Sequence, residues 1–206
     1  MTTFIKVSMN VILFVSLFAK SVLSQKMSYT INQLWDSRTV PEHDNVFVQF
    51  EYVDNSTTNT RDLQIKVQAP FYDDPNINDT VPKGSMDKLW EYEVVEVFLL
   101  GSDEKYLEIE FSPKEQYLLL QLQGYRNVIK SPLYIDNYSA KIDGKTWSGT
   151  YVIPFEYLPP NVAKFNAYAI HGTDDARQYL ALFPTPFGKF KEPDFHRLDY
   201  FQKFEL

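Results

Sequence analysis

The sequence has 206 residues, of which 44% are hydrophobic and 16% aromatic, and its formal net charge is −7. This acidic balance disfavours binding to nucleic acid or to an anionic membrane through the overall field of the protein. The chain contains no cysteine, which excludes disulfides, thiolate metal sites and cysteine nucleophiles.

The first 24 residues have the pattern of a secretory signal peptide. Lys6 gives a positive start, Val11 to Ala19 form a short apolar run, and small Ser24 precedes Gln25. The run is too short to span a bilayer, and no second run of membrane length follows. We therefore expect a secreted mature chain of residues 25–206, with 18 basic and 27 acidic residues and a net charge of −9. An uncleaved anchor is the alternative.

Two further features bear on the secretory route. Acceptor triplets for N-linked glycosylation begin at Asn55, Asn78 and Asn137. The last four residues, Lys203-Phe204-Glu205-Leu206, differ from a KDEL-type retrieval signal only at Phe204. The sequence thus predicts a glycoprotein, and leaves open whether it is exported or held in the lumen of the endoplasmic reticulum.

Residues 25–206 contain no repeat and no linker, but short runs of alternating polarity separated by turn residues. This pattern predicts an all-β, single-domain antiparallel β-sandwich. A helical turn is expected only at "FEYLPPN", where Pro159 and Pro160 stop it. The expected strands are 46–53, 63–70, a hairpin within 89–113, 116–124, 145–154, 165–172 and 178–184.

The hairpin can be given a register. With "GSDEK" (101–105) as the loop and Leu100 opposite Tyr106, facing residue numbers sum to 206. A slip by two residues keeps each face intact, whereas a slip by one would mix apolar and charged positions, which burial forbids. One face is then wholly apolar, as a buried inner face should be. It contains Val95, Val97, Leu99, Leu107, Ile109 and Phe111.

The opposite face combines acidic and aromatic side chains, and it is either a solvated surface or a ligand groove. In this register Glu96 lies opposite Glu110, a like-charge pair that costs stability unless it is compensated. Water would screen the pair on a solvated surface, but such a surface has no need of several large rings. The pattern favours a groove whose acids accept hydrogen bonds and whose rings stack on a ligand. This face and the segment before it contain Trp90, Tyr92, Val94, Glu96, Phe98, Tyr106, Glu108 and Glu110.

Five stretches resemble, in order and spacing, an uncharacterised animal protein family known from an open reading frame. They are "LWEYEVVEVFL", "YLEIEFSP", "KTWSGTYVIPFEYL", "FNAYAIHG" and "PDFHRLDYF", and the resemblance as a whole extends over nearly all of residues 25–206. More distantly, the same landmarks resemble carbohydrate-binding modules of family 9, which are β-sandwiches. The resemblance therefore implies the same fold class as the strand pattern.

The resemblance to the modules also implies roles for particular residues. The modules carry a tryptophan, an acid three residues later and a glutamate six residues later, and Trp90, Glu93 and Glu96 match this spacing. By resemblance, Trp90 forms one wall of a sugar site and Glu96 accepts sugar hydroxyls. The modules' last motif holds a second aromatic wall, which implies Phe195 or His196. Two positions depart from the modules: Glu108 stands where they place an arginine, and no tryptophan stands at the second wall.

Catalysis and metal binding are alternatives. A glycosidase needs two carboxyls across a cleft, and Glu96 with Glu110 or Glu108 could supply them. The polar loops at 54–62 and 73–79 offer oxygen ligands for Ca²⁺, and the modules can hold structural Ca²⁺. Neither loop has EF-hand spacing, however, and Asp and Asn are common in turns.

The histidines give no catalytic or zinc pattern. His43, His171 and His196 show no paired metal spacing, and the sequence has no GxSxG elbow and no phosphate-binding glycine loop. His171 ends a predicted strand, where a structural role is the common one. Arg126 follows the third strand of the hairpin region, where it either neutralises the acidic face or anchors a ligand.

We therefore expect non-catalytic recognition of a carbohydrate or similar polar ligand, without a nucleic-acid partner and without membrane insertion after signal cleavage. A glycoside-active enzyme and an interaction module without a small ligand are the alternatives. The expected ligand-binding residues are Trp90, Tyr92, Glu93, Glu96, Glu108, Glu110, Arg126, His171, Phe195 and His196.

Overall fold

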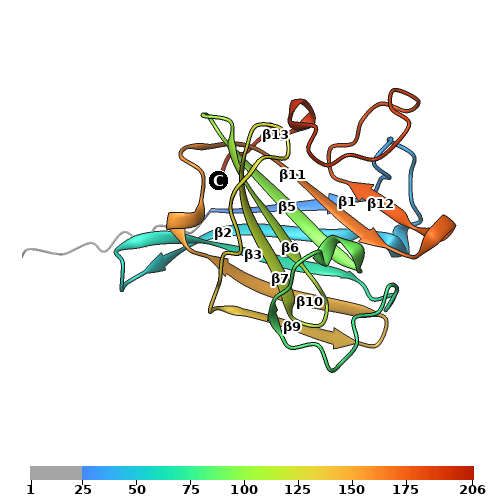
Figure 1. Cartoon of the computed structure of the whole chain (residues 1–206), viewed down its shortest axis with the longest axis horizontal. Coiled ribbons are helices and arrows are strands. Elements are labelled where there is room, and N and C mark those ends of the chain that lie inside the picture. The colour runs from blue at the N-terminus through green and yellow to red at the C-terminus, as the bar shows by residue number, and fades with distance from the viewer. Residues whose placement is uncertain (1–24) are drawn as a thin grey trace, which may run out of the picture.

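Alternating apolar and polar residues form two β-sheets that pack face to face in the computed structural model, which describes residues 25–206 (Figure 1). The predicted signal peptide, residues 1–24, lies outside the described residues. Paired strands are antiparallel, except that β4 and β7 are parallel. The predicted all-β antiparallel sandwich is confirmed.

One sheet has five strands in the order β1-β2-β3-β10-β9. Its strands are β1 (Lys26–Ile31), β2 (Val46–Asn55), β3 (Thr60–Pro70), β10 (Thr146–Ile153) and β9 (Tyr138–Asp143). The edge strands β1 and β9 were not predicted from the sequence. Both contain exposed polar positions on an edge, so their apolar pattern is weak.

The other sheet has eight strands and contains the predicted hairpin. Its main path is β12-β11-β5-β6-β7-β4, with β13 beside β11 and β8 beside β7. Its strands are β12 (Gln178–Ala181), β11 (Val162–His171), β5 (Val94–Gly101), β6 (Lys105–Phe111), β7 (Gln116–Gln123), β4 (Gly84–Ser85), β13 (Gln202–Lys203) and β8 (Val128–Lys130).

Single 3₁₀ turns punctuate the connections. The turn η3 (Phe155–Tyr157) forms where "FEYLPPN" predicted a helical turn. The others are η1 (Glu42–Asp44), η2 (Leu89–Glu91), η4 (Asp174–Ala176) and η5 (Leu198–Tyr200). Of these, η2 and η4 matter for the site, because they lie just before β5 and β12.

The hairpin register is the predicted one. Leu100 pairs with Tyr106, and Glu96 pairs with Glu110. Because side chains alternate along a strand, this register sends the apolar set of β5 and β6 into the space between the sheets. There it packs against residues of the five-stranded sheet such as Phe50, Ile65 and Tyr151, all of which are fully buried.

The outer face of the eight-stranded sheet is buried as well. Phe98 and Tyr106 belong to a second apolar cluster that includes Leu89 from the segment before β5 and Phe195 and Phe201 from the C-terminal segment. Figure 1 shows that C-terminal segment, in red, beside β11, β12 and β13. The acidic face is therefore not a solvated surface, because residues distant in sequence cover it.

Candidate ligand groove

A groove of about 320 Å³ opens on the covered outer face, above β5 and β6. Its floor is formed by Glu96 of β5 and Glu108 of β6, and apolar side chains from β7 and β11 extend it on both sides. The volume lies at the small end of the range for ligand pockets in proteins. The apolar residues of the floor are Leu120, Leu122 and Ile170.

Trp90 forms one wall of the groove. It lies in η2, and its side chain is 38% exposed. Arg177 ties this turn to the sheet, because its guanidinium donates to the Trp90 carbonyl at 2.5 Å and to the Glu91 carbonyl at 3.2 Å. The same guanidinium donates to the hydroxyl of Tyr179 at 3.0 Å. The position of Trp90 therefore depends on a residue that lies 87 positions later in the chain.

The C-terminal segment forms the opposite wall. The Phe195 ring stacks on Tyr168 of β11, with ring centroids 3.9 Å apart. Asp194 accepts hydrogen bonds from Arg126 at 2.8 Å and from the His196 backbone at 3.0 Å. These contacts fix the segment from both ends of the groove. Glu96 lies between the two walls, because Trp90 precedes β5 and His196 contacts Phe98, two residues beyond Glu96.

His196 is held between Tyr106 and Glu108. The Tyr106 hydroxyl accepts the Arg126 backbone N–H at 3.2 Å and lies 2.8 Å from His196 Nδ1, so it can donate its own proton to that nitrogen. In that tautomer the ring proton lies on Nε2, which is 3.9 Å from Glu108 Oε2. Burial, and secondly Arg126, lower the pKa of His196 to about 4. Nε2–H and Glu108 Oε2 thus face each other without a direct hydrogen bond.

Three carboxyl groups are buried under the groove, and of these Glu96 and Glu108 have a positive charge nearby, whereas Glu110 has none in the described part of the chain. Glu96, Glu108 and Glu110 are 2%, 5% and 0% exposed. Burial raises the pKa of Glu108 to about 7, although Arg126 opposes the rise. Burial and the neighbouring Glu108 raise the pKa of Glu96, and burial with the charges of Glu96 and Glu108 raises that of Glu110. Within residues 25–206, Glu96 Oε1 and Glu108 Oε2 accept no hydrogen bond.

Six of the expected residues line the groove, and four lie elsewhere. Trp90, Glu96, Glu108, Arg126, Phe195 and His196 line it. Glu110 lies beside them with no exposed surface, and Tyr92 packs partly buried against the outer cluster. Glu93 and His171 lie in a separate cluster near Tyr72, because Glu93 has the opposite strand parity from Glu96.

This separate cluster anchors the loop that follows β3. Both carboxylate oxygens of Glu93 lie 3.2 Å from the Tyr72 backbone nitrogen. The Tyr72 ring stacks on His171 with centroids 3.9 Å apart, and its hydroxyl donates to Asp44 at 2.5 Å. Burial raises the pKa of Glu93 to about 7, against the effect of the backbone N–H groups. The packing is tight, so Glu93 and His171 hold the loop in place.

Sequence reasoning missed three residues that shape the groove, namely Arg177, Tyr179 and Asp194. Asp194 directly precedes the "FHR" stretch and could have been found from it. Arg177 follows η4 in "DDARQY", and no local pattern shows that its partners are the carbonyls of Trp90 and Glu91.

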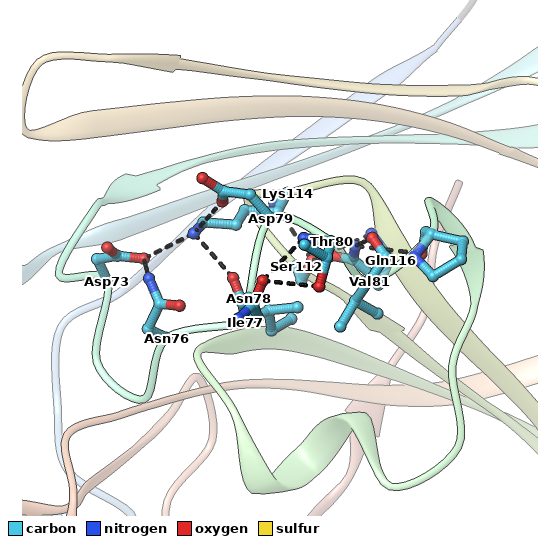
Figure 2. A network of polar contacts seen from close by, with 11 residues as sticks. Asp73, Asn76, Ile77, Asn78, Asp79, Thr80, Val81, Ser112, Lys114 and Gln116 are labelled. Carbon is cyan, nitrogen blue, oxygen red and sulfur yellow. Dashed lines mark hydrogen bonds and ion pairs between the residues drawn. The ribbon is translucent and has the colours of Figure 1, made fainter.

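The loop expected to offer oxygen ligands for Ca²⁺ is organised around a lysine (Figure 2). Lys114 Nζ lies 3.2 Å from Asp73 Oδ1, 2.8 Å from Asp79 Oδ1 and 2.9 Å from the Ile77 carbonyl. Among residues 25–206, no group of three acidic or histidine side chains could hold a metal ion. Calcium binding here stays a prediction, and the Lys114 ammonium would compete with it for the same oxygens.

Replacing Lys114 by alanine is expected to lower the free energy of unfolding by about 1 kcal/mol, because a carbonyl and two carboxylates lose a charged donor. Urea denaturation measures the change. The matched control is Lys191→Ala at an exposed position, which should change stability by less than about 0.5 kcal/mol. Equal stability of the two variants would contradict a role for Lys114 in holding the loop.

The predicted glycosylation sites differ in their surroundings. The Asn55 amide donates to Asp62 at 2.8 Å, so a glycan at Asn55 would displace a hydrogen bond. Asn78 is exposed, and its Oδ1 accepts the Thr80 hydroxyl at 2.8 Å. Asn137 is exposed in the connection before β9. Glycosylation at all three positions stays a prediction.

The possible retrieval signal is packed against the sandwich. Gln202 and Lys203 pair with β11, and Phe204 is 8% exposed within the inner core. The Phe204 ring contacts Phe50 and Phe165 at centroid distances of 5.5 and 5.4 Å. A receptor that reads Lys203 to Leu206 would first have to separate Phe204 from these rings.

The fold and the groove together define a β-sandwich protein with a ligand-sized groove on the outer face of one sheet. The chain belongs to the UPF0462 protein C4orf33 family. It is 40% identical to the human member over 184 residues, which cover 87% of this chain and 88% of the human one. It is also 40% identical to the mouse homologue over 184 residues, which cover 87% of this chain and 92% of the mouse one. The zebrafish homologue is 39% identical over 184 residues, 87% of this chain and 89% of its own.

A solved structure gives an independent comparison of the fold. The chain is similar to a protein from Bacteroides uniformis described as "a putative carbohydrate-binding protein", with a TM-score of 0.55 and 15% identity over 87% of this chain and 86% of that one. At this identity the similarity concerns the fold. No protein-family model matches the chain. Within residues 25–206, no helix is long and apolar enough to cross a membrane.

Proposed function

We propose that the chain binds a carbohydrate or a similar polar ligand in this groove, without catalysing a reaction. The observation that carries the proposal is the pair of unpaired buried oxygens, Glu96 Oε1 and Glu108 Oε2, on the floor of an open groove. A buried carboxylate without a donor is costly. A ligand whose hydroxyls donate to both oxygens would remove that cost.

The aromatic walls suit the apolar face of a sugar ring. Trp90, Phe195 and His196 all line the groove. Large rings offer contact area with little loss of side-chain entropy on binding. Between His196 Nε2 and Glu108 Oε2, 3.9 Å apart, one hydroxyl could accept from the imidazole and donate to the carboxylate. This arrangement would orient the ligand as well as bind it.

The resemblance to family 9 modules and the fold of the bacterial protein support the same class of ligand. We also propose that the protein acts in the secretory pathway, as a secreted or lumenal glycoprotein. That proposal rests on the pattern of residues 1–24 and on the acceptor triplets at Asn55, Asn78 and Asn137. Mass spectrometry of the protein purified from culture medium would test cleavage before Gln25 and the three glycans.

Trp90→Ala is expected to weaken glycan binding about tenfold, because the variant loses the stacking surface of one wall. Calorimetry on soluble glycans that score positive on an array measures the change. Tyr134→Ala is the matched control, since Tyr134 is 63% exposed and does not line the groove. No binding by the wild type, or equal binding by the two variants, would contradict the proposed site.

A second candidate is hydrolysis of a glycoside. The specific observation in its favour is Glu108, whose pKa of about 7 suits an acid–base catalyst and which lines the groove with a second carboxyl group, Glu96. Turnover on a panel of aryl glycosides, abolished in Glu108→Gln while binding persists, would establish it. Binding without turnover leaves the non-catalytic function.

A further inference from the structure

We infer that the groove selects a sugar that carries a free, protonated amine over neutral and acidic sugars. This inference deepens the proposed function and rests on it. It depends on which polar groups in the groove are already engaged by the protein and which are available to a ligand.

The available groups are mainly acceptors. Glu96 Oε1 and Glu108 Oε2 accept no hydrogen bond within the described chain, and both residues are more than nine-tenths buried. When ionised, these carboxylates can only accept, and a donor that a ligand places on them favours the ionised form. His196 Nε2–H is a ring donor to the groove in the tautomer whose Nδ1 accepts from Tyr106. A ligand must therefore supply donors to the floor.

The two arginines of the groove are already engaged. Arg126 donates to Asp194 at 2.8 Å and to the Tyr125 hydroxyl at 3.3 Å. Arg177 donates to two main-chain carbonyls of η2 and to Tyr179. Recognition of a carboxylate or phosphate needs guanidinium donors that face the ligand, and here all three nitrogens of Arg177, and Nε and Nη2 of Arg126, donate to the protein. An acidic sugar would thus meet the carboxylates of the floor with only Nη1 of Arg126 to offset them.

The charge balance of the groove favours a cation. Arg126 and Asp194 neutralise each other as an ion pair. Arg177 and Arg126 act on Glu96, and Arg126 also acts on Glu108, so two guanidinium groups stand against three glutamates and Asp194. Burial keeps the carboxyls from ionising freely, and a ligand ammonium would supply the missing positive charge together with up to three donors. A hydroxyl supplies a donor without the charge.

The test compares isosteric sugars. Glucose, its three amino-deoxy derivatives with the amine at carbon 2, 3 or 6, and glucuronate are titrated into the full chain near neutral pH, with binding measured by calorimetry or ligand-observed NMR. At least one amino sugar is expected to bind about tenfold more tightly than glucose, since one charge-assisted hydrogen bond contributes about 1.5 kcal/mol or more. Glucuronate should bind more weakly than glucose.

The variant Glu96→Gln separates charge from shape. It keeps the size of the side chain and removes its charge, so the preference for the amine over glucose, taken as the ratio of the two dissociation constants measured with the variant, should fall to about twofold or less. Melting temperature and near-ultraviolet circular dichroism confirm that the variant is folded. Tyr134→Ala should keep the full preference.

The two proposals fail in different ways. Equal binding of glucose and all three amino sugars, or tighter binding of glucuronate, overturns the inference of a cationic ligand and leaves carbohydrate binding intact. A preference for the amine that survives in Glu96→Gln also overturns it. No binding of these five sugars, while a neutral glycan binds on the array, overturns the inference alone. No binding of these sugars or of any glycan on the array overturns the proposed function and this inference together.

Discussion

Replacing Glu110 by glutamine should stabilise the protein above neutral pH by about 2 kcal/mol. Glu110 has no exposed surface, and it pairs across the hairpin with Glu96. Its ionisation therefore buries an uncompensated charge next to a like charge. Glutamine keeps the shape and removes the charge, so the penalty at high pH disappears.

The sign of the pH dependence follows from the direction of the shifts. Burial and the charges of Glu96 and Glu108 raise the pKa of Glu110 above its unfolded value. A raised pKa gives a stability contribution that is fully present below the unfolded pKa, near 4.3, and is lost as pH rises through the folded pKa. Glu108 has a folded pKa of about 7, which sets the pH range over which this loss of stability occurs. The stability of the wild type should therefore fall between about pH 5 and pH 8.

His196 changes the pH dependence of stability in the opposite direction. Its folded pKa of about 4 lies below the unfolded value, so its contribution is lost as pH falls below about 6.5. Because three glutamates oppose one histidine, urea denaturation should show stability that increases as pH falls from 8, with a smaller slope below about pH 6.5, where the His196 contribution is lost. Glu110→Gln should make the profile shallower, whereas exposed Glu156→Gln should follow the wild type. Superimposable profiles for all three proteins would contradict the buried-charge account.

Gly172→Ala is expected to cost about 3 kcal/mol of stability and to weaken ligand binding. Gly172 directly follows β11 and has a φ of +79°, and a Cβ atom there would lie 2.5 Å from the Ala176 carbonyl oxygen. The variant therefore combines a left-handed backbone conformation with a clash against main chain. Relief of the clash must move the turn that carries Arg177, and with it the support of Trp90.

Gly124→Ala is the matched control for this effect. Gly124 also has a positive φ, +67°, but a Cβ atom there meets no other atom within 4 Å. Gly124→Ala should lower the free energy of unfolding by only about 1 kcal/mol, which is the cost of the left-handed backbone conformation alone. It should leave ligand binding unchanged. Equal losses in the two variants, or unchanged binding in Gly172→Ala, would contradict the coupling between this turn and Trp90.

The register of the hairpin could be predicted from the sequence for a simple physical reason. Side chains alternate with period two along a strand, and only one parity sends every apolar residue of β5 and β6 inward. The pairing of Glu96 with Glu110 follows from this and from the loop at 101–105. The residues of the inner face could therefore be predicted from the sequence of this hairpin alone.

The cover over the outer face could not be predicted in the same way. Leu89, Phe195 and Phe201 pack on it from segments remote from β6, and such contacts leave no periodic pattern. The role of Arg177 was hidden for the same reason, since its acceptors are main-chain carbonyls that any residue provides. A resemblance to a known family suggested Trp90 as one wall of the site and Phe195 or His196 as the other, which strand periodicity cannot do.

The burial of β5 and β6 on both faces has a consequence for how the groove moves. Each of these strands is hydrogen-bonded to a neighbour on either side, so its amide hydrogens should exchange with solvent only through global unfolding. The turn η2, which carries Trp90, is a single 3₁₀ turn tied to Arg177 through main-chain carbonyls, and its amides should exchange through local opening. Glu96 and Glu108 thus form a rigid floor that accepts hydrogen bonds from a ligand, while Trp90 can adjust to ligands of different thickness.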